Sequence, residues 1–310
     1  MDIFWENKKI LITGGNGFLG KHLVNRLKEK GVREENIFAP TFDEYDFKKM
    51  EDCQKAISKK QIVIHLAGIV GGLEFNQSHS GQIFYDNGAM ALNILEVCRL
   101  EKIEKFVGIG SVCEYPKLAP IPFREEDLWD GYPDPINAPY GLAKKMMLVG
   151  SQAYRTEYGL NAIHLLMTNF YGPGDNFDPK TSHVIPALIK KVADAKKEGR
   201  GYIEVWGTGK ATRSFLYVKD AVEAIILATE KYNKPEPINV GPNIEISIKE
   251  LVEMICKLMS FTGQIHWDTS KPDGQPRRAL DTSKAEKEFG FVAKASFEEG
   301  LKEEVNYYNT

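Results

Sequence analysis

Short apolar runs alternate with longer amphipathic segments over the first half of the chain. The short runs are apolar at nearly every position, which is typical of strands buried on both faces of a parallel sheet. They predict strands at residues 9–13, 36–39, 61–66, 105–109 and 162–166. The segments between them carry apolar residues at helical spacing, which predicts helices at 18–30, 47–59, 83–100 and 140–158. This alternation predicts an α/β fold with a doubly wound parallel sheet covered by helices on both faces.

The pattern changes after about residue 170. Residues 171–179 read Tyr-Gly-Pro-Gly-Asp-Asn-Phe-Asp-Pro, which is typical of a loop. A helix is expected at 183–197, followed by short strands and helices and by a final amphipathic helix at 297–307. We therefore expect a smaller α/β C-terminal domain. Four lysines are interpreted as a solvated helix face, with one of them as a candidate for facing a ligand: Lys190, Lys191, Lys196 and Lys197.

The composition of the 310 residues excludes several classes of protein. Hydrophobic residues make up 43% and charged residues 27%, which rules out a disordered chain. Forty basic and 43 acidic residues give a net charge of −3, so the chain lacks the basic field of a nucleic-acid-binding protein. It shows no secretory signal, no apolar run of about 18 residues and no metal-like cysteine spacing. We expect a cytoplasmic protein with no metal, no nucleic-acid partner and no membrane span.

Three glycines follow the first predicted strand and open the first predicted helix. In a dinucleotide-binding turn, the first glycine allows the tight turn, the second lets the backbone approach a pyrophosphate, and the third lets helix and strand pack closely. The helix N-terminus also offers free N–H groups to the phosphates. The alternative is a glycine-rich turn with no ligand. We predict a Rossmann-like dinucleotide-binding domain with these cofactor-binding residues: Gly14, Asn16, Gly17, Phe18, Leu19 and Gly20.

The sequence after the second predicted strand leaves the choice between NAD and NADP open. An acidic residue about 20 positions beyond the glycines binds the ribose of NAD, whereas an Arg accommodates the 2′-phosphate of NADP. Residues 40–44 read Pro-Thr-Phe-Asp-Glu, with neither an Arg nor an acid directly at the strand end. Asp43, Glu44 and Asp46 are equally consistent with a ribose or adenine contact and with exposed turn residues.

Tyr140 and Lys144 lie four positions apart in a predicted helix, hence on one face. A Tyr with its ordinary pKa near 10 exchanges protons near neutrality when a nearby cation favours the phenolate, and a Lys one turn away supplies that cation. Ser111 follows the fourth predicted strand, so all three lie at the carboxyl edge of the sheet, where ligands bind in such folds. Together they resemble the Ser/Tyr/Lys set of the short-chain dehydrogenase/reductases that act on sugar nucleotides.

Longer motifs point to a narrower group. Residues 110–117 read Gly-Ser-Val-Cys-Glu-Tyr-Pro-Lys, and residues 139–144 read Pro-Tyr-Gly-Leu-Ala-Lys. Further shared segments extend over nearly the whole chain, at 168–177, 182–188, 205–209, 271–274 and 276–278, with Arg213. The sequence resembles the extended short-chain dehydrogenase/reductases and, within them, the GDP-L-fucose synthases.

The resemblance implies conversion of GDP-4-keto-6-deoxy-D-mannose to GDP-L-fucose, by epimerisation at C3 and C5 and NAD(P)H-dependent reduction at C4. The keto group acidifies the C3 and C5 hydrogens through an enolate, so inversion needs a base on one face and an acid on the other. By similarity Cys113 is the base and His183 the acid, and both residue types have ordinary pKa values within about two units of pH 7. Without the resemblance, Cys113 is interpreted as a packing residue and His183 as a helix-terminal histidine.

For the reduction, the resemblance implies that Tyr140 protonates the C4 oxygen while Ser111 hydrogen-bonds to it. Lys144 is expected to depress the Tyr140 pKa and to hold the nicotinamide ribose. The implied cofactor is NADP, with NAD as the alternative, and further cofactor contacts are implied at Leu66, Ala67, Asn87 and Asn169. Contacts with the sugar nucleotide are implied at Asn169, His183, Lys191, Trp206, Arg213 and Arg278.

The resemblance also implies a division of the chain and a partner. The dinucleotide-binding domain is expected at residues 1–170 with about 215–242, and the sugar-nucleotide domain at about 171–214 with 243–310. Family members commonly dimerise through two long helices of each subunit. We therefore expect a homodimer formed by the helices at 83–100 and 140–158.

Several positions depart from the family pattern. Val112 replaces a second Ser before the Cys, and Lys191 stands where an Arg is common. Glu114 replaces an apolar residue and is a candidate for altering the sugar accepted. Asn16 and Pro40 stand at the positions of the two Arg residues that support NADP binding. These departures leave open a related NDP-hexose or NDP-heptose epimerase, C4-reductase or C4-dehydrogenase and, from another class, a non-catalytic dinucleotide-sensing protein.

Overall fold

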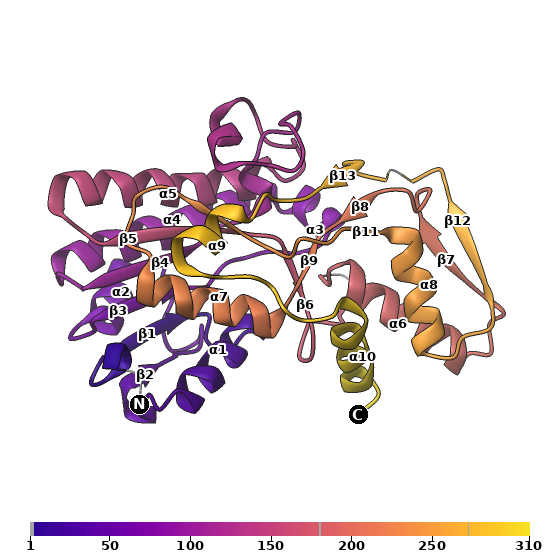
Figure 1. The fold of residues 1–310 in the computed structure, drawn as a ribbon, viewed down its shortest axis with the longest axis horizontal. Coiled ribbons are helices and arrows are strands. Elements are labelled where there is room, and N and C mark those ends of the chain that lie inside the picture. Colours follow the sequence, from indigo (N-terminus) through magenta and orange to yellow (C-terminus); the bar gives the residue numbers. More distant parts are fainter. Residues whose placement is uncertain (1–2, 180, 272) are drawn as a thin grey trace.

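Six parallel strands form the central sheet of the computed structural model, which describes residues 3–179, 181–271 and 273–310 (Figure 1). Their order across the sheet is β10-β5-β4-β3-β1-β2. The strands are β1 (Ile10–Thr13), β2 (Ile37–Phe38), β3 (Ile62–His65), β4 (Lys105–Ile109), β5 (Ala162–Met167) and β10 (Ile238–Val240). The predicted doubly wound parallel sheet is confirmed, because all five neighbouring strand pairs are parallel.

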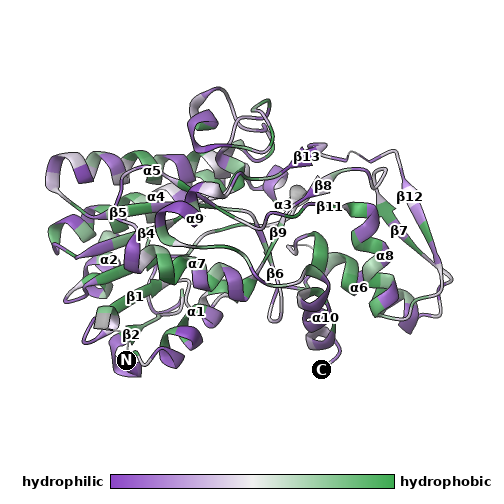
Figure 2. Cartoon of the chain, viewed as in Figure 1, coloured by the Kyte–Doolittle hydropathy of each residue, from purple (hydrophilic) through white to green (hydrophobic). Residues whose placement is uncertain are grey.

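Helices cover both faces of this sheet because its strands are apolar at successive positions. In β1, Ile10 and Ile12 pack into one hydrophobic core, while Leu11 between them packs into another on the opposite face. The first core includes residues of α1 (Phe18–Glu29) and α7 (Val218–Lys231). The second includes residues of α2 (Met50–Ile57), α4 (Ser80–Leu100) and α5 (Ala138–Tyr158). The apolar colouring of the strands between these helices is visible in Figure 2.

The direction of strand addition reverses between β1 and β3. The chain first steps from β1 to β2 on one side, and then crosses to β3 on the other side of β1. Thr13 and His65 end these two strands in register, with Thr13 Oγ1 2.7 Å from His65 Nδ1. The carboxyl ends of the strands on either side of such a reversal form the usual ligand crevice of an open α/β sheet.

The remaining elements lie mostly beyond this carboxyl edge, on the right of Figure 1. Two strand pairs are β6 (Asn169–Tyr171) with β9 (Phe215–Tyr217) and β7 (Tyr202–Trp206) with β12 (Gln264–Asp268). A third group joins β8 (Thr212–Arg213) to β11 (Ile246–Ser247) and β13 (Arg277–Arg278). The helices are α3 (Leu73–Ser78), α6 (Val184–Lys197), α8 (Ile248–Leu258), α9 (Ser283–Phe289) and α10 (Phe297–Tyr308). Short 3-10 helices occur at Ile3–Trp5, Glu34–Asn36, Val112–Glu114 and Glu125–Trp129.

The ends of several elements differ from those that periodicity predicts. The strand expected at 36–39 is only Ile37–Phe38, because the preceding residues turn into a 3-10 helix. The helix expected at 47–59 is Met50–Ile57, since Ser58 is no longer helical and Lys59 has a φ of +61°. Apolar spacing follows the buried face of an element, whereas its ends depend on local backbone geometry.

All four lysines of α6 are partly or fully exposed, as the solvated-face interpretation predicts, and two of them also bind backbone carbonyls. Lys191 Nζ donates a hydrogen bond to Glu204 O in β7, at 2.7 Å, and Lys196 Nζ donates to Met259 O beyond α8. Their long alkyl chains lie along the protein while the ammonium groups satisfy backbone carbonyls. Across the described ranges of the chain, no helix has both the length and the apolar character needed to cross a membrane.

Candidate active site

The glycines of the turn after β1 let neighbouring backbone segments approach each other closely. Gly14 has a φ of +70°, and a Cβ there would lie 2.8 Å from Ala67 N in the loop after β3. A Cβ at Gly20 would clash with Gly14 O and the backbone of Gly15. Gly17 caps α1 without any side-chain hydrogen bond, so the N–H groups of the first turn stay available for an anion. This cradle of backbone fits the pyrophosphate of a dinucleotide.

The other three residues predicted to bind the cofactor at this turn differ from one another in exposure and contacts. Asn16 is exposed and donates a hydrogen bond from Nδ2 to Ala39 O at the end of β2, at 2.8 Å. Phe18 is partly buried at the start of α1, opposite Gly174 of the loop after β6. Leu19 packs into the core, so only its backbone remains for a ligand. Asn16 therefore ties the glycine turn to β2, which no spacing rule indicated.

The loop after β3 connects three parts of the site. Ala67 N–H donates to Thr13 Oγ1 at 3.2 Å, and Leu66 N–H donates to Thr13 O at 3.1 Å. A Cβ at Gly68 would lie 3.0 Å from Asn87 Oδ1 and 3.7 Å from Lys144 Nζ. A Cβ at Gly72 would lie 3.2 Å from Ser182 O, next to His183. One stretch, residues 66–72, thus borders the glycine turn, the helix α5 and the start of α6.

Asn87 holds this loop in place. Its Oδ1 accepts a hydrogen bond from Ile69 N–H at 3.0 Å, and its Nδ2 donates to Ile69 O at 2.9 Å and to Ile83 O at 2.7 Å. The residue was predicted as a cofactor contact. In the structure both ends of its amide bind backbone, so its described contacts shape the loop that borders the cofactor turn.

Ser111 and Cys113 lie in a 3-10 turn directly after β4. Ser111 caps the turn: its Oγ accepts a hydrogen bond from Cys113 N–H at 3.2 Å, so its own hydroxyl hydrogen is left for another acceptor. The sulfur of Cys113 lies 3.8 Å from Arg278 Nη1 in β13. The other three cysteines are buried, whereas Cys113 is partly exposed. The turn therefore presents a hydroxyl and a thiol at the carboxyl edge of the sheet.

Tyr140 and Lys144 occupy the first turns of α5 on one face, as their spacing predicts. Lys144 Nζ lies 5.7 Å from the centroid of the Tyr140 ring. A Cβ at Gly141 would clash with Cys113 O, which shows how closely α5 packs on the turn that carries Ser111 and Cys113. Burial lowers the pKa of Lys144 to about 8. Ser111, Cys113, Tyr140 and Lys144 thus come from two elements in direct contact.

The expected depression of the Tyr140 pKa is wrong. Burial, with smaller contributions from Cys113 and Glu114, raises the pKa of Tyr140 above its ordinary value. The ammonium group of Lys144 lies over the ring face. At neutral pH Tyr140 is therefore a protonated phenol, the state required to donate a proton to a developing alkoxide.

His183 and Asn169 lie on separate segments at the same edge. His183 is the N-cap of α6 and is partly buried, and burial lowers its pKa, which favours the neutral imidazole. Asn169 is the first residue of β6, two positions after the end of β5, and is also partly buried. Asn169 therefore follows the carboxyl end of β5, whereas His183 is linked to the site through its neighbour Ser182, whose carbonyl lies beside Gly72 of the loop after β3.

Two arginines are brought together by strand register. Arg213 of β8 and Arg278 of β13 are paired residues of neighbouring parallel strands. Arg213 Nη1 donates to Thr212 O at 2.7 Å, and Arg278 Nε donates to Gln275 Oε1 at 2.8 Å. Burial lowers the pKa of Arg213 to about 10, with Arg278 adding to the effect by repulsion. Two partly buried guanidinium groups side by side favour a multivalent anion between them.

Lys191 and Trp206, two further predicted contacts of the sugar nucleotide, lie on α6 and at the end of β7. The ammonium group of Lys191 binds Glu204 O in β7, and Trp206 ends that strand with 51% of its surface exposed. Lys271 Nζ lies 5.3 Å from the centroid of the Trp206 ring.

Sequence reasoning missed the role of Asp273. Its carboxylate accepts hydrogen bonds from Thr208 N–H and Oγ1 and so joins the two loops beside Arg213. Only the contact itself reveals this link.

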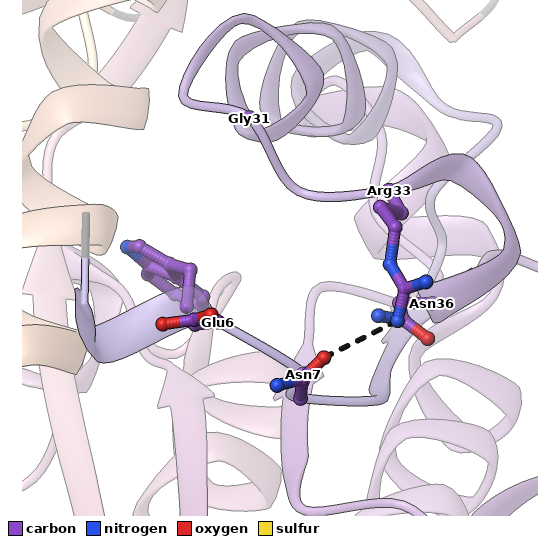
Figure 3. Close-up of a pocket in the computed structure, with 6 residues that line it drawn as sticks. Glu6, Asn7, Gly31, Arg33 and Asn36 are labelled. Atoms are coloured by element: carbon purple, nitrogen blue, oxygen red, sulfur yellow. Dashed lines mark hydrogen bonds between the residues drawn. The ribbon is translucent and has the colours of Figure 1, made fainter. Parts of the chain in front are cut away.

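A small pocket lies elsewhere, before β1 and β2 (Figure 3). Its wall includes Glu6, Asn7 and Arg33, and Arg33 Nη2 donates to Asn7 Oδ1 at 3.3 Å. These residues precede the strands, whereas ligands of open α/β sheets bind where the strands end. The pocket is therefore separate from the candidate active site.

The fold and the turn after β1 define a Rossmann-type enzyme of the short-chain dehydrogenase/reductase class. Comparison with known families narrows this class: the "NAD dependent epimerase/dehydratase family" matches residues 10–241. The chain belongs to this family and is an NAD(P)-dependent enzyme of nucleotide-sugar metabolism.

Individual relatives cover nearly the whole chain. A GDP-L-fucose synthase of Sinorhizobium fredii is 37% identical over 96% of this chain and 94% of its own length. Among solved structures, a GDP-6-OMe-4-keto-L-xylo-heptose reductase from C. jejuni has a TM-score of 0.90 at 28% identity, covering 98% of both chains. A GDP-L-fucose synthetase from Naegleria fowleri bound to NADP has a TM-score of 0.89 at 28% identity, covering 98% of this chain and 94% of its own.

Proposed function

We propose that this protein converts GDP-4-keto-6-deoxy-D-mannose to GDP-L-fucose by epimerisation at C3 and C5 and reduction at C4. The observation that carries the proposal is the position of Cys113. Its sulfur lies on the turn that presents Ser111, against the helix that carries Tyr140 and Lys144, and 3.8 Å from Arg278. A thiol in this position supports an acid–base step in addition to reduction. The GDP-L-fucose synthase relative supports the same substrate.

The epimerisation requires a base and an acid on opposite faces of the sugar. Cys113 removes the proton from C3 and then from C5, and the carbanion is delocalised into the C4 carbonyl as an enolate. His183 supplies the proton on the other face. Between the two epimerisations Cys113 releases the proton it has taken to solvent, and His183 takes up a new one from solvent. The guanidinium of Arg278 lies against the Cys113 thiol, with Nη1 3.8 Å from the sulfur.

The reduction uses the protonated form of Tyr140. A nicotinamide dinucleotide, when bound, supplies the electron pair for the C4 carbonyl. Tyr140 donates its phenolic proton to the C4 oxygen, and the free hydroxyl hydrogen of Ser111 binds the same oxygen. Lys144, with a pKa of about 8, is mainly an ammonium ion at neutral pH and stabilises the phenolate left behind.

The sugar nucleotide is held through its pyrophosphate. Arg213 and Arg278 lie opposite one another on adjacent strands and together match the charge of a pyrophosphate. Asn169, Lys191 and Trp206 are proposed as further contacts, with Trp206 covering the sugar or the base. The proposed cofactor is NADP, supported by the NADP-bound relative, although Asn16 and Pro40 replace the usual arginines.

Deuterium exchange tests the proposal. The purified protein is incubated in deuterated water with the keto-sugar nucleotide and NADPH. We expect NADPH oxidation and deuterium at both C3 and C5. Cys113→Ser should abolish the deuterium at both carbons, whereas Cys256→Ser, which changes a cysteine buried in α8, should incorporate it normally. Absence of both deuterium and NADPH oxidation in the wild-type protein contradicts the proposal.

A second candidate is a C4-reductase of a GDP-heptose that does not epimerise. The structural similarity to the C. jejuni heptose reductase favours it, with a TM-score of 0.90. The same experiment separates the two candidates. A heptose reductase oxidises NADPH with a GDP-4-keto-heptose and leaves C3 and C5 free of deuterium.

We also propose a division of the chain and a dimer. Residues 1–170 with about 215–242 bind the dinucleotide, and about 171–214 with 243–310 bind the sugar nucleotide. The helices α4 and α5 pack side by side and expose Phe84, Tyr85, Leu92 and Val149, which supports a four-helix interface between two subunits. Sedimentation equilibrium should give twice the 34.9 kDa mass of one chain, and a single-chain mass at micromolar concentration contradicts the dimer.

A further inference from the structure

A buried carboxylate and a buried imidazole lie directly against the catalytic turn. Both oxygens of Glu114 lie 3.1 Å from His164 Nε2 in β5, and Oε1 also accepts a hydrogen bond from Ser111 N–H at 2.8 Å. The side chain of Glu114 has no exposed surface and that of His164 is 1% exposed. The carboxylate therefore does not reach the surface of the site, and the expectation that Glu114 alters the sugar accepted stays a prediction.

The backbone at residue 110 is adapted to this pair. A Cβ at Gly110 would overlap His164 Nε2 and Glu114 Oε1. Gly110 lies at the end of β4, where its N–H donates to Leu165 O at 2.8 Å. Gly110, Glu114 and His164 thus form one packed unit. A buried acid of this kind is costly unless its hydrogen bonds are made, so a role beyond filling space is indicated.

The pair controls the orientation of Ser111. Glu114 accepts the N–H of Ser111, while Ser111 Oγ accepts the N–H of Cys113, and together these bonds form a capping box. The first bond fixes the backbone of Ser111, and the second directs its hydroxyl hydrogen away from the turn. The Glu114 carboxylate therefore holds Ser111 directly, and Ser111 in turn holds Cys113.

The charge of Glu114 also acts on α5. Burial lowers the pKa of Lys144, and the Glu114 carboxylate opposes this change by favouring the ammonium form. After burial and Cys113, the same carboxylate is the third cause that raises the pKa of Tyr140. The other titratable groups around Glu114 are Cys113 and Tyr115 on its own segment, Lys145 on α5 and His164 on β5.

We propose that Glu114 and His164 are positioning residues for the carbonyl reduction. They hold the turn from Ser111 to Cys113 in place and supply the negative charge that keeps Lys144 an ammonium ion beside Tyr140. This inference rests on the proposed function, because it concerns the same site. It adds a role for two residues that lie outside the set expected from the sequence.

The variant Glu114→Gln tests the charge. It keeps the size of the side chain and an oxygen that accepts the Ser111 N–H. Removing a negative charge lowers the pKa of both Lys144 and Tyr140, so the loss of reduction rate at high pH should move to lower pH by about one unit. At pH 8 we expect kcat to fall about fivefold, because without the Glu114 charge fewer Lys144 side chains are ammonium ions there, while KM for the sugar nucleotide stays unchanged. An unmoved pH profile overturns the proposal.

A second readout does not depend on turnover. The affinity for NADPH, measured by its fluorescence from pH 6 to 10 without sugar, reports the charge of Lys144 beside the cofactor. Its pH dependence should shift by the same unit in Glu114→Gln. If the wild-type protein reduces no keto sugar, the proposed function fails, while this titration still decides the role of the pair: a shift supports it and identical titrations contradict it.

Two further variants separate the effect of the Glu114 charge on the pH profile from its effect on folding stability. Glu114→Ile alone leaves His164 without its partner and should lower Tm, whereas the double variant Glu114→Ile/His164→Val should recover Tm yet keep the shifted pH profile. The matched control is Glu125→Gln, which changes a partly buried acid bonded to Asn239 N–H outside the site. Glu125→Gln should leave the profile in place, and a shift as large as that of Glu114→Gln overturns the proposal.

Discussion

The two halves of the candidate site are built in different ways. Around Gly14 the backbone itself makes the binding surface, because residues without side chains allow β1, α1 and the loop after β3 to approach closely. Around Arg278 the surface is made by side chains from distant segments, with the sulfur of Cys113 and the guanidinium of Arg213 as neighbours. A backbone surface depends on spacing within one short segment, whereas a side-chain surface depends on the whole fold.

This difference determines how each half responds to mutation. A side chain added at Gly14 has no space to occupy, so the turn itself must change. A side chain removed at Arg278 leaves the strands intact and removes only charge and hydrogen bonds. We therefore expect substitutions in the glycine turn to affect stability and dinucleotide binding together. Substitutions of Arg213 or Arg278 should affect the binding of the sugar nucleotide but not that of the dinucleotide.

The largest expected effect is that of Arg278→Gln. The variant loses one of the two guanidinium groups proposed to bind the pyrophosphate. KM for the GDP-sugar should rise about 100-fold, because removing one partner of a partly buried cation–anion contact typically costs several kcal/mol. The Kd for NADPH should stay unchanged. Steady-state kinetics and fluorescence titration measure the two quantities.

Arg277→Gln is the matched control for this change. Arg277 is adjacent in sequence but exposed, and its guanidinium pairs with Glu245. We expect its KM to remain within about twofold of the wild type, since exposed ion pairs contribute little. Equal KM values for the Arg277 and Arg278 variants would mean that the sugar nucleotide does not use the Arg213–Arg278 pair.

A smaller effect is expected for Gly14→Ala. The φ of +70° and the 2.8 Å approach of the new Cβ to Ala67 N should cost about 1–3 kcal/mol of unfolding free energy. Dinucleotide binding should weaken in the same variant. Thermal unfolding with and without NADPH measures both, because a ligand that binds only the folded state raises Tm.

Gly17→Ala provides the comparison within the same turn. Its φ lies in the extended region, and a Cβ there meets only Gly14 O, at 3.2 Å. We expect a Tm close to that of the wild type together with weaker NADPH binding, since the methyl group stands where a phosphate would approach. If Gly14→Ala leaves both Tm and NADPH binding unchanged, the glycine half does not depend on close backbone contact.

The sequence predicts the first half of the site better than the second. The sheet follows from apolar runs, and Gly14, Gly17 and Gly20 follow from a spacing of three that requires backbone contact. The face shared by Tyr140 and Lys144 follows from the helical repeat. Each of these predictions depends on residues within about one turn of each other, so a linear pattern contains the information.

The remainder depends on contacts between distant segments. The strands β8 and β13 have two residues each, too short for any periodicity, and yet their register brings Arg213 beside Arg278. The pKa of Tyr140 depends on burial, which residue spacing does not describe. The partner of Glu114 is 50 positions away in β5. Only the family resemblance indicated Cys113 and His183 in advance.

The loop of residues 66–72 joins the two halves of the site. It touches the cofactor turn at Ala67, borders Lys144 at Gly68 and meets Ser182 at Gly72. Asn87 anchors its middle to α4 through both ends of its side-chain amide. The span that meets the glycine turn is therefore the same span that lies beside the start of α6. A substitution within residues 66–72 should reach both halves of the crevice at once.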